Sequence, residues 1–442
     1  MGIFMSISPI EQRYATEMNS LFEEKAKLDG WMRVEVALAR AHAKLGHIPK
    51  NSADEIEAAA SKVQLSRVLE IENEIHHDLM AMVRALSENC GESGKFVHLG
   101  ATSYDIEDTA LALTMRDAGG LLRSRIIGLQ EILGRLAKEK KSLVCVGRTH
   151  GQHAVPTTYG MKFALIYEAL ERQVALLDNA IRQISAGKMS GAVGTMATFG
   201  KDAFKLQEIV MEELGLESAP ITTQVIGRER HAQMLFVIAS IASILDKLAK
   251  DIRNLSRNEI LEVAEGFAKK QVGSSTMPQK RNPHKCERIC SLARLVRANC
   301  SVALENIPLE HERDLTNSAN ERFIIPQSFI LCDYMLKQTS LVLESLEFFE
   351  ANIKKNLEMG GGAILAERAM MALAEKGMGR QEAHELVRTI AKEAAKEGKP
   401  LKEALAQNKK ASDLLDEKEL EKIFDYSTYT GKAEEIVKKI IK

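Results

Sequence analysis

The chain has 442 residues, enough for two or three domains and a large buried core. Its 60 Lys and Arg residues nearly balance 61 Asp and Glu residues, so no overall charge attracts nucleic acid or an anionic membrane surface, and we expect neither as a partner. The six cysteines include no CxxC pair, which indicates reduced thiols, and the first residues lack the pattern of a signal peptide, so we expect a cytoplasmic protein.

Most of the chain is predicted to be helical. Proline occurs nine times and is absent from residues 50–155, 157–219, 221–277 and 327–399, which allows long uninterrupted helices. Alternating strand patterns are scarce. One apolar stripe at helical spacing consists of Leu235, Ile238, Ala242, Leu245, Ala249 and Ile252. We therefore predict an all-α fold with a central bundle of long helices.

This architecture has consequences for assembly. A long helix buries one apolar stripe, so a single chain would leave a wide apolar strip exposed, which predicts a homo-oligomer. The apolar segment 232–245 is interpreted as too short and too polar to span a bilayer. We expect an N-terminal helical domain at 1–108, the central bundle at 109–355 and a C-terminal helical domain at 356–442.

Two polar segments interrupt the first third of the helical pattern. PIEQRY (9–14) places Arg13 and Tyr14 ahead of the first long helix, where they could grip a phosphate, although a solvated arginine is the simpler interpretation. EIHHDL (74–79) contains His76 and His77. Adjacent histidines on a helix point in different directions, so a metal pair is not expected there.

The third segment, VHLGATSYDIEDT, contains His98, Thr102, Ser103 and Asp105. Small hydroxyl residues after a glycine offer both backbone N–H groups and side-chain donors, which suits a carboxylate or a phosphate. A helix-capping loop would use the same residues, so the segment alone does not decide between the two.

Two further segments carry cations and imidazoles. GRTHGQHAVPTT (147–158) contains His150 and His153, and its flanking Gly, Arg and Thr predict a loop. No HExxH pattern accompanies them, so zinc is not expected, and a histidine acting as acid or base fits better. HERDLTNSANER (311–322) places Arg313, Ser318 and Arg322 at helical or near-helical spacing, as a clamp for an anion or as a solvated face.

The segment GSSTMPQKRNPHK (273–285) is predicted to be an irregular connection between two helices, the second beginning near His284. It lacks the GxxxxGK[ST] pattern of a phosphate-binding P-loop, and no strand precedes it. All of these segments offer donors or cations and none is an apolar ligand box. Together they predict one composite site for a polyanionic small molecule.

GSSTMPQKRNPHKCE closely resembles the signature of the fumarase/aspartase superfamily. With PIEQRY, HHD, TSYDIEDT, GRTHGQHAVPTT, TTQVIGR (222–228) and ERDLTNSANER, the chain resembles, from about Pro9 to residue 437, the members that release fumarate from succinylated purine nucleotides. The resemblance implies a three-domain helical fold, a homotetramer with shared active sites, a small-molecule succinyl nucleotide as substrate, and acid–base chemistry without a cofactor or a metal.

The resemblance also implies residue roles. His150 matches the general acid, Ser274 the general base on a mobile loop, and His77 a histidine near the scissile bond. Lys280 and Glu287 match residues that position the substrate and polarise the site. The positions that match substrate-binding residues are Arg13, Tyr14, His76, Asp78, His98, Thr102, Ser103, Gln224, Arg288, Arg313, Ser318 and Arg322. Small departures occur at His76, Thr276 and Thr316, and they affect only fine substrate contacts.

Other functions stay open at this point. An argininosuccinate lyase or a carboxymuconate cycloisomerase would share the GSS motif, although Arg13 and the arginines of ERDLTNSANER favour a phosphorylated nucleotide. A catalytically silent helical scaffold is a different class, which the intact His150, Ser274, Lys280 and Glu287 disfavour. A nucleic-acid-binding module fits less well, given the neutral charge and single Trp.

Overall fold

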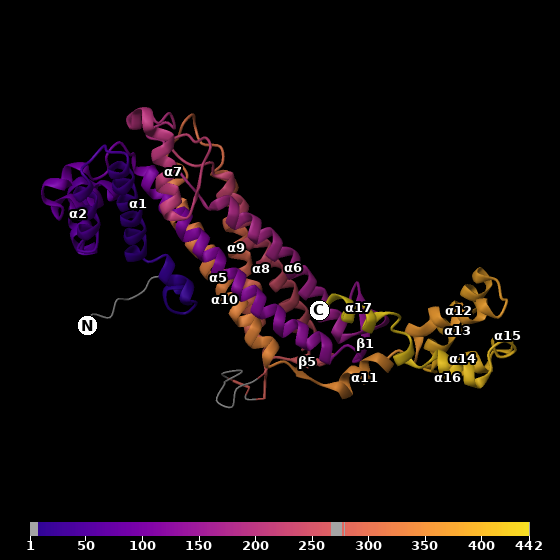
Figure 1. The fold of residues 1–442 in the computed structure, drawn as a ribbon. Coiled ribbons are helices and arrows are strands. Elements are labelled where there is room, and N and C mark those ends of the chain that lie inside the picture. The colour runs from indigo at the N-terminus through magenta and orange to yellow at the C-terminus, as the bar shows by residue number, and fades with distance from the viewer. Residues whose placement is uncertain (1–7, 267–275, 278, 442) are drawn as a thin grey trace. The chain divides into compact units, whose positions relative to one another are not determined.

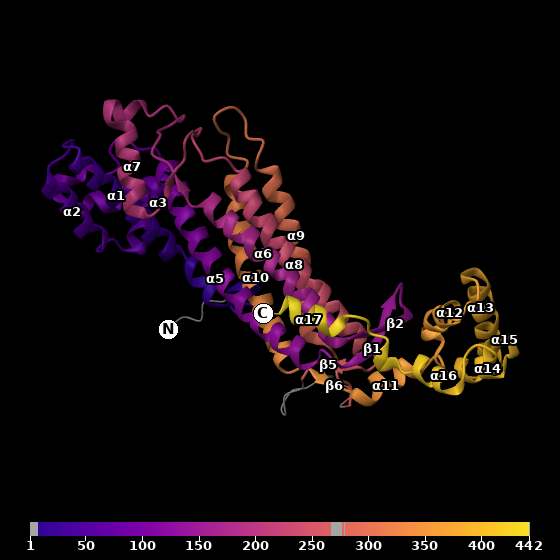
Figure 2. The ribbon, with the colours of Figure 1, turned by 45° about the vertical axis from the view of Figure 1, so that its right-hand side comes forward.

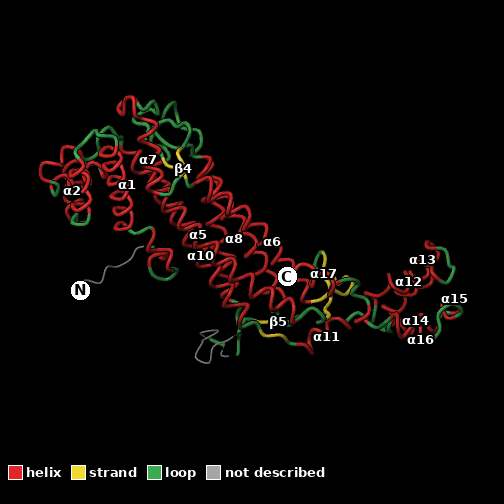
Figure 3. The backbone as a smooth tube through the Cα atoms, in the orientation of Figure 1, coloured by secondary structure: helices red, strands yellow, loops and turns green. Residues whose placement is uncertain are grey.

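The computed structural model describes residues 8–266, 276–277 and 279–441. Helices make up most of its regular structure, and the strands are short (Figure 3). The chain forms two compact units that each combine several stretches of sequence. Unit 1 comprises Met1–Ile127, Arg172–Asp246 and Ile289–Gln338, and unit 2 comprises Gly128–Glu171, Lys247–Arg288 and Thr339–Lys442. The predicted helical class is confirmed.

The first part of unit 1 is a cluster of short and medium helices. They are η1 (Pro9–Glu11), η2 (Glu17–Leu21), α1 (Glu24–Lys44), α2 (Lys50–Ala60), α3 (Leu65–Ile75), α4 (Asp78–Glu88) and η3 (Gly91–Phe96). Further along the chain come β3 (Ala186–Gly187), η4 (Ala197–Asp202), α7 (Ala203–Leu214) and β4 (Glu217–Ser218). Strands β3 and β4 pair in parallel.

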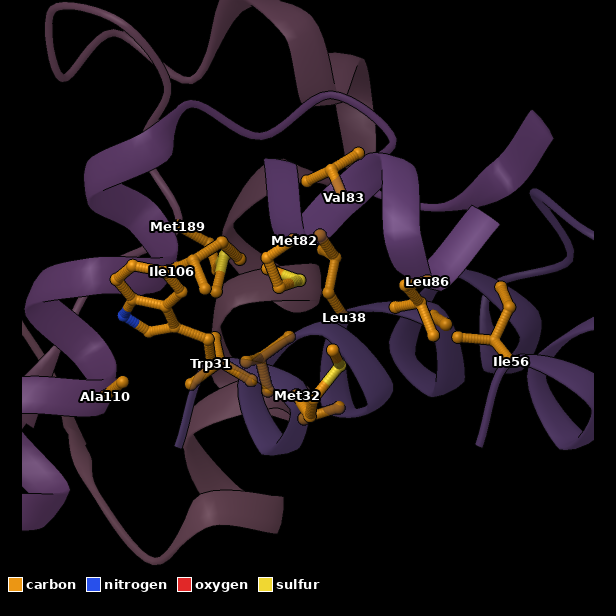
Figure 4. Close-up of a cluster of buried hydrophobic side chains, with 14 of the residues drawn as sticks. Trp31, Met32, Leu38, Ile56, Met82, Val83, Leu86, Ile106, Ala110 and Met189 are labelled. Atoms are coloured by element: carbon orange, nitrogen blue, oxygen red, sulfur yellow. The ribbon is translucent and has the colours of Figure 1, made fainter. Parts of the chain in front are cut away.

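These helices share one apolar core, part of which Figure 4 shows. In α1, Leu28, Trp31, Met32 and Leu38 recur at helical spacing and are each no more than 5% exposed. Trp31 lies beside Ile106 in the core (Figure 4). Burial of large apolar side chains of this kind stabilises a fold by about 1.5–3 kcal/mol each. The core thus fixes the start of α5 (Ser103–Glu139), the helix that follows η3 along the chain and that carries residues of the site.

Five long helices supply the bundle, and parts of each belong to both units. They are α5 (Ser103–Glu139), α6 (Tyr159–Ile184), α8 (Glu229–Leu255), α9 (His284–Glu305) and α10 (Ser318–Glu344). Within unit 1, α5, α8 and α10 run side by side (Figures 1 and 2). In α8 the predicted stripe is confirmed, because all six of its residues are buried.

Helix α8 also corrects one detail. It is longer than the apolar segment predicted within it, and by length and composition alone it could cross a membrane. However, 67% of its apolar window is buried inside the protein, as in the core helix of a globular fold. Burial, rather than shortness, is therefore the argument against a membrane span.

Unit 2 contains a β-hairpin and a set of C-terminal helices. Its strands are β1 (Val144–Thr149), β2 (Gln152–Thr158), β5 (Val263–Ala264) and β6 (Glu347–Phe348), and its remaining helices are α11 (Glu350–Glu358), η5 (Ala363–Leu365), α12 (Ala366–Glu375), α13 (Arg380–Glu397), α14 (Leu401–Gln407), α15 (Lys409–Ser412), α16 (Glu417–Ile423), η6 (Tyr426–Thr428) and α17 (Ala433–Ile440). Helices α12, α13, α14 and α16 enclose a second apolar core around Leu373, Leu405 and Leu420.

The hairpin differs from the loop predicted at 147–158. Strands β1 and β2 pair antiparallel, with Thr149 opposite Gln152 and only His150 and Gly151 between them. Both turn residues have positive φ, 53° and 75°, as a tight two-residue turn requires. Histidine tolerates this conformation better than most residues, and glycine adopts it freely. The turn places His150 at the tip of a rigid ribbon.

Other local predictions have mixed outcomes. Helix α9 begins at His284, as predicted. His76 and His77 do not lie on one helix, because His76 ends α3 with a left-handed φ of 54° and His77 precedes the first residue of α4. Segment 311–317 is not helical, and α10 begins only at Ser318. In each case the polar residues lie at the ends of helices.

Candidate active site

A cavity of about 430 Å³ in unit 1 brings together nine of the predicted site residues. They are His76, His77, Asp78, Thr102, Ser103, Gln224, Arg313, Ser318 and Arg322. Glu72, Tyr104, Glu107 and Leu315 complete the lining. These residues come from four separate segments of the chain, so the cavity is a composite site, as the sequence predicts.

The two histidines at the rim are positioned by helix ends. His77 is the N-cap of α4, and its Nδ1 accepts a hydrogen bond of 3.3 Å from the backbone N–H of Met80. Because Nδ1 is an acceptor, a neutral His77 carries its proton on Nε2. The side chain is 48% exposed, so this Nε2–H is available to a ligand.

The Thr102–Ser103 turn is held rigid from behind. The buried carboxylate of Asp105 accepts hydrogen bonds from the backbone N–H groups of Thr102, at 2.9 Å, and Ser190, at 2.9 Å. It also forms an ion pair with Lys188, and both side chains are fully buried. Asp105 thus provides an acceptor for the backbone N–H of Thr102, the residue just before α5. The backbone of Thr102 is thus held by Asp105, and the side chains of Thr102 and Ser103 line the cavity.

Arg313 is the strongest candidate for binding an anion. Its guanidinium group lies 3.4 Å from the centre of the Tyr104 ring, and Nη1 donates to Gln224 Oε1 at 3.1 Å. Its Nε and Nη2 are buried and have no hydrogen-bond partner among the described residues. Buried donors without a partner are costly and rare in folded proteins, so these two N–H groups indicate a ligand that accepts from both.

A second arginine lies at the more open side of the cavity. Arg322 Nη2 lies 2.9 Å from Asp78 Oδ2, and the arginine side chain is 60% exposed. An exposed pair of this kind contributes little to stability, so Arg322 can exchange its partner for a ligand oxygen. Tyr104 donates a long hydrogen bond of 3.5 Å to Ser318 Oγ.

A buried ionic network supports the same wall. Arg228 contacts Asp108 at 2.9 Å and Glu321 at 3.0 Å, and all three side chains are nearly inaccessible. Burial by itself would raise the pKa of Asp108, but the charge and hydrogen bonds of Arg228, together with smaller contributions, outweigh it and hold this pKa below its ordinary value. Burial also lowers the pKa of the neighbouring His231 to about 3, so that ring is neutral.

Glu107 is a lining residue that sequence reasoning missed. It lies on α5 one turn after Ser103 and three residues after Tyr104, so all three share a helix face. Burial, followed by the charges of Asp78 and Asp108, raises the pKa of Glu107 to about 8. The spacing within TSYDIEDT was the available signal, but it could not show that this face borders a cavity.

His98 does not line the cavity but lies just before the Thr102 turn. Its Nδ1 and Glu35 Oε1 are 2.6 Å apart, and its backbone N–H donates to Glu35 Oε2 at 3.1 Å. Burial opposes a charge on the ring, yet the hydrogen bond and the charge of Glu35 outweigh it and raise the pKa of His98. The acidic partner lies 63 positions earlier on α1, so sequence alone could not reveal it.

The N-terminal pair is also outside this cavity. Tyr14 packs edge-on against Tyr334, with 5.1 Å between ring centres, and Arg13 is exposed. Both residues belong to unit 1, and Arg13 is accessible to an anionic ligand.

In unit 2, the hairpin that carries His150 is anchored at its base. Glu262, which is fully buried, forms an ion pair with Arg148 and accepts hydrogen bonds from Tyr159 at 2.7 Å and Asn356 at 3.1 Å. Burial and the charge of Glu262 raise the pKa of Tyr159, which stays protonated as a donor. His150 itself is exposed at the tip. A rigid base therefore presents an accessible imidazole.

Lys280 and Glu287 line another cavity of unit 2, of about 990 Å³. Its cations are Lys250, Arg253, Arg257, Lys280 and Arg281. Glu265 accepts from the backbone N–H of Cys286 at 2.6 Å and so caps the start of α9. Arg288 follows Glu287 on that helix. Ser274, the predicted base, lies outside the described residues.

No group of three or more His, Cys, Asp or Glu side chains with the geometry of a metal site occurs within residues 8–266, 276–277 and 279–441. The geometry of the described part of the site is therefore that of hydrogen-bond donors, cations and imidazoles around polar cavities. Such a site suits acid–base chemistry on an anionic substrate.

Comparison with known proteins gives a consistent family. Residues 11–298 match a family model described as "Lyase", and residues 362–440 match a model described as "Adenylosuccinate lyase C-terminus". Adenylosuccinate lyase of Pyrococcus abyssi is 54% identical over 440 residues, covering 99% of this chain and 98% of the relative. Adenylosuccinate lyase of Bacillus subtilis is 40% identical over 418 residues, covering 95% of this chain and 96% of the relative.

Two solved structures share the fold. A fumarate lyase from Mesorhizobium sp. BNC1 superposes with a TM-score of 0.90 at 32% identity, covering 97% of this chain and 98% of that one. A 3-carboxy-cis,cis-muconate lactonizing enzyme from Pseudomonas putida gives a TM-score of 0.90 at 30% identity, with 98% of each chain covered. Fold and sequence together show that the chain belongs to the fumarase/aspartase superfamily of lyases.

Within that superfamily, the relatives found by sequence define a narrower family than the relatives found by structure. Identity to adenylosuccinate lyases extends over the whole chain, and the C-terminal segment matches a model particular to them. The chain is a member of the adenylosuccinate lyase family, whose enzymes are carbon–nitrogen lyases of purine biosynthesis.

Proposed function

We propose that this chain cleaves fumarate from adenylosuccinate, which leaves AMP, and from succinylaminoimidazole carboxamide ribotide, which leaves the aminoimidazole carboxamide ribotide. The unit 1 cavity carries this proposal. Its single most telling feature is Arg313, which offers two buried N–H donors without a partner among the described residues, next to the hydroxyls of Thr102 and Ser103. A phosphate or a carboxylate has the paired acceptors that such donors need.

The elimination involves two proton transfers, one from carbon and one to nitrogen, and moves two bonding electron pairs. A base removes a proton from the succinyl carbon next to a carboxylate, and the negative charge that develops is delocalised into that carboxylate. The electron pair then forms the C=C bond of fumarate, while the C–N bond breaks and its electrons go to the purine nitrogen. An acid donates a proton to that nitrogen. The scheme uses acid–base groups alone and calls for no cofactor.

Each step needs a different kind of residue. His150 suits the acid, since an imidazole ring can carry and donate a proton and this ring is accessible at the tip of the hairpin. Ser274 is proposed as the base, and Lys280 as the cation that stabilises the alkoxide and the charge on the succinyl carboxylate. Glu287 is proposed to position these groups, with Arg288 as a further substrate contact.

We further propose that the chain assembles as a homotetramer with active sites shared between subunits. His150 and Lys280 are both exposed in the single chain, yet proton transfer and charge stabilisation are most effective where water is excluded. A second subunit that covers these groups would supply the dry environment. We also propose three domains, at 1–108, 109–355 and 356–442. A cytoplasmic location is proposed as well.

The direct test is an absorbance assay of the purified protein with four substrates: the two succinyl nucleotides, argininosuccinate and carboxymuconate. We expect turnover of both nucleotides and none of the other two compounds above background. Turnover of argininosuccinate or carboxymuconate without turnover of adenylosuccinate would reject the proposal. Absence of activity with all four would favour a silent scaffold.

A further inference from the structure

Glu107 lines the candidate site, but the proposed mechanism assigns it no role. It lines the cavity that contains Arg313 and also a neighbouring cavity of unit 1, of about 200 Å³. The apolar lining of that second cavity comprises Leu21, Phe22, Trp31, Ala110, Leu111, Ile325 and Pro326. Charged residues such as Asp78, Asp108 and Arg322 line it as well, so Glu107 borders both a cavity of mixed apolar and charged lining and the polar cavity.

The carboxyl group of Glu107 has no hydrogen bond or ion pair with any residue in the described parts of the chain. Neither arginine of the shared lining pairs with it: Arg322 pairs with Asp78 at 2.9 Å, and Arg313 stacks on Tyr104. A partly buried carboxyl group without a partner disfavours its charged form. The place of Glu107 in a lining that it shares with Asp78 and Asp108, without a cationic partner of its own, thus favours the protonated carboxylic acid.

Some charges around Glu107 raise its pKa and others lower it. The titratable and charged residues that line the two cavities with it are Glu24, Lys27, Glu72, His76, His77, Asp78, Tyr104, Asp108, Arg228, Arg313, Glu321 and Arg322. Burial has the largest effect, the charges of Asp78 and Asp108 add to it, and Arg313 and Arg322 only partly offset them, so the pKa of Glu107 rises to about 8. At pH 7 the group is mainly neutral, and above pH 8 it is mainly ionised.

We propose that Glu107 is a specificity residue of the nucleotide site: it holds a proton when the substrate binds, donates it in a hydrogen bond to an acceptor atom of the succinyl nucleotide, and weakens binding when it ionises. This inference rests on the proposed function of the cavity. A neutral carboxylic acid can donate a hydrogen bond, whereas a carboxylate can only accept one and repels an anionic substrate.

The test is the pH dependence of KM for adenylosuccinate. For the wild type we expect KM to rise about tenfold between pH 7 and pH 9, because the protonated fraction of a group with a pKa near 8 falls from about 90% to about 10%. Glu107→Gln keeps an N–H donor of similar shape but cannot ionise, so its KM should stay nearly constant. Glu72→Gln, which removes a different carboxylate of the same cavity, should keep the rise.

A second measurement detects the protonation state of Glu107 directly. Difference infrared spectra of the unliganded enzyme should show the C=O stretch of a carboxylic acid that is lost as the pH passes about 8, and Glu107→Gln should lack it. Wild-type turnover with a pH-independent KM, or a KM that rises equally in the wild type and Glu107→Gln, overturns this inference alone. A wild type that turns over no succinyl nucleotide rejects the proposed function and this inference together.

Discussion

Replacing His150 with alanine should lower kcat by about 10²- to 10⁴-fold, the usual contribution of a general acid. The side chain is exposed at the tip of the β1–β2 hairpin, so its removal leaves no cavity in the core. The anchor of the hairpin, Glu262 with Arg148 and Tyr159, is untouched. The measurement is kcat with adenylosuccinate, together with thermal unfolding to show that the fold is retained.

The matched control is His153→Ala. His153 lies on the same hairpin, opposite Arg148, and it lines a cavity of unit 2 with Gly151 and Gln152. We expect its loss to leave kcat within a few fold of the wild type, because it has no role in the proposed proton transfer. Wild-type turnover in His150→Ala, or equal losses in both variants, would contradict the assignment of His150.

Replacing Ser274 with alanine should lower kcat by a similar factor, about 10²–10⁴, because the variant lacks the proposed base. KM should change much less, since binding is assigned to the hydroxyls and arginines of the unit 1 cavity. The control is Thr276→Ala, which removes a hydroxyl two positions away. Steady-state kinetics of both variants, with their oligomeric state, provide the test.

The outcome for Ser274 separates two mechanisms. If Ser274→Ala keeps the wild-type kcat, the base lies elsewhere. If Thr276→Ala lowers kcat as much as Ser274→Ala does, the segment affects catalysis through its conformation rather than through the Ser274 hydroxyl. A serine hydroxyl is a weak base at neutral pH, so its action depends on a nearby cation, for which Lys280 is proposed.

The helical architecture was predictable because it follows from local rules. Long intervals without proline and one apolar stripe per helix specify long packed helices, and the six stripe residues of α8 are all buried. The hairpin at residues 144–158 was not predicted. Its two-residue turn is His150–Gly151 rather than the common Asn–Gly or Asp–Gly, so the usual turn signal was missing.

The site was predictable in part. The polar segments that interrupt the helices supplied nine of the residues in the unit 1 cavity, because helix ends offer unpaired donors and accommodate polar side chains. Tyr104 and Glu107 were missed, although both lie within TSYDIEDT. Which helix face borders a cavity depends on packing against distant segments, and a single sequence does not contain that information.

Supporting residues were the least predictable. Glu35 fixes His98 from 63 positions away, and Glu262 fixes Arg148 from 114 positions away. Isolated glutamates usually indicate solvated surface positions. Only the tertiary fold distinguishes these two buried carboxylates from the many exposed ones.

We propose that residues from separate segments, contributed by different subunits, act as one site. The most direct test mixes His150→Ala with Ser274→Ala protein, dissociates and reassembles the subunits, and measures adenylosuccinate cleavage. Random assembly should restore about a quarter of wild-type activity, since about one site in four then combines an intact His150 with an intact Ser274. Mixing His150→Ala with His150→Gln should restore none. A mixture of His150→Ala and Ser274→Ala no more active than its separate components would contradict the shared site.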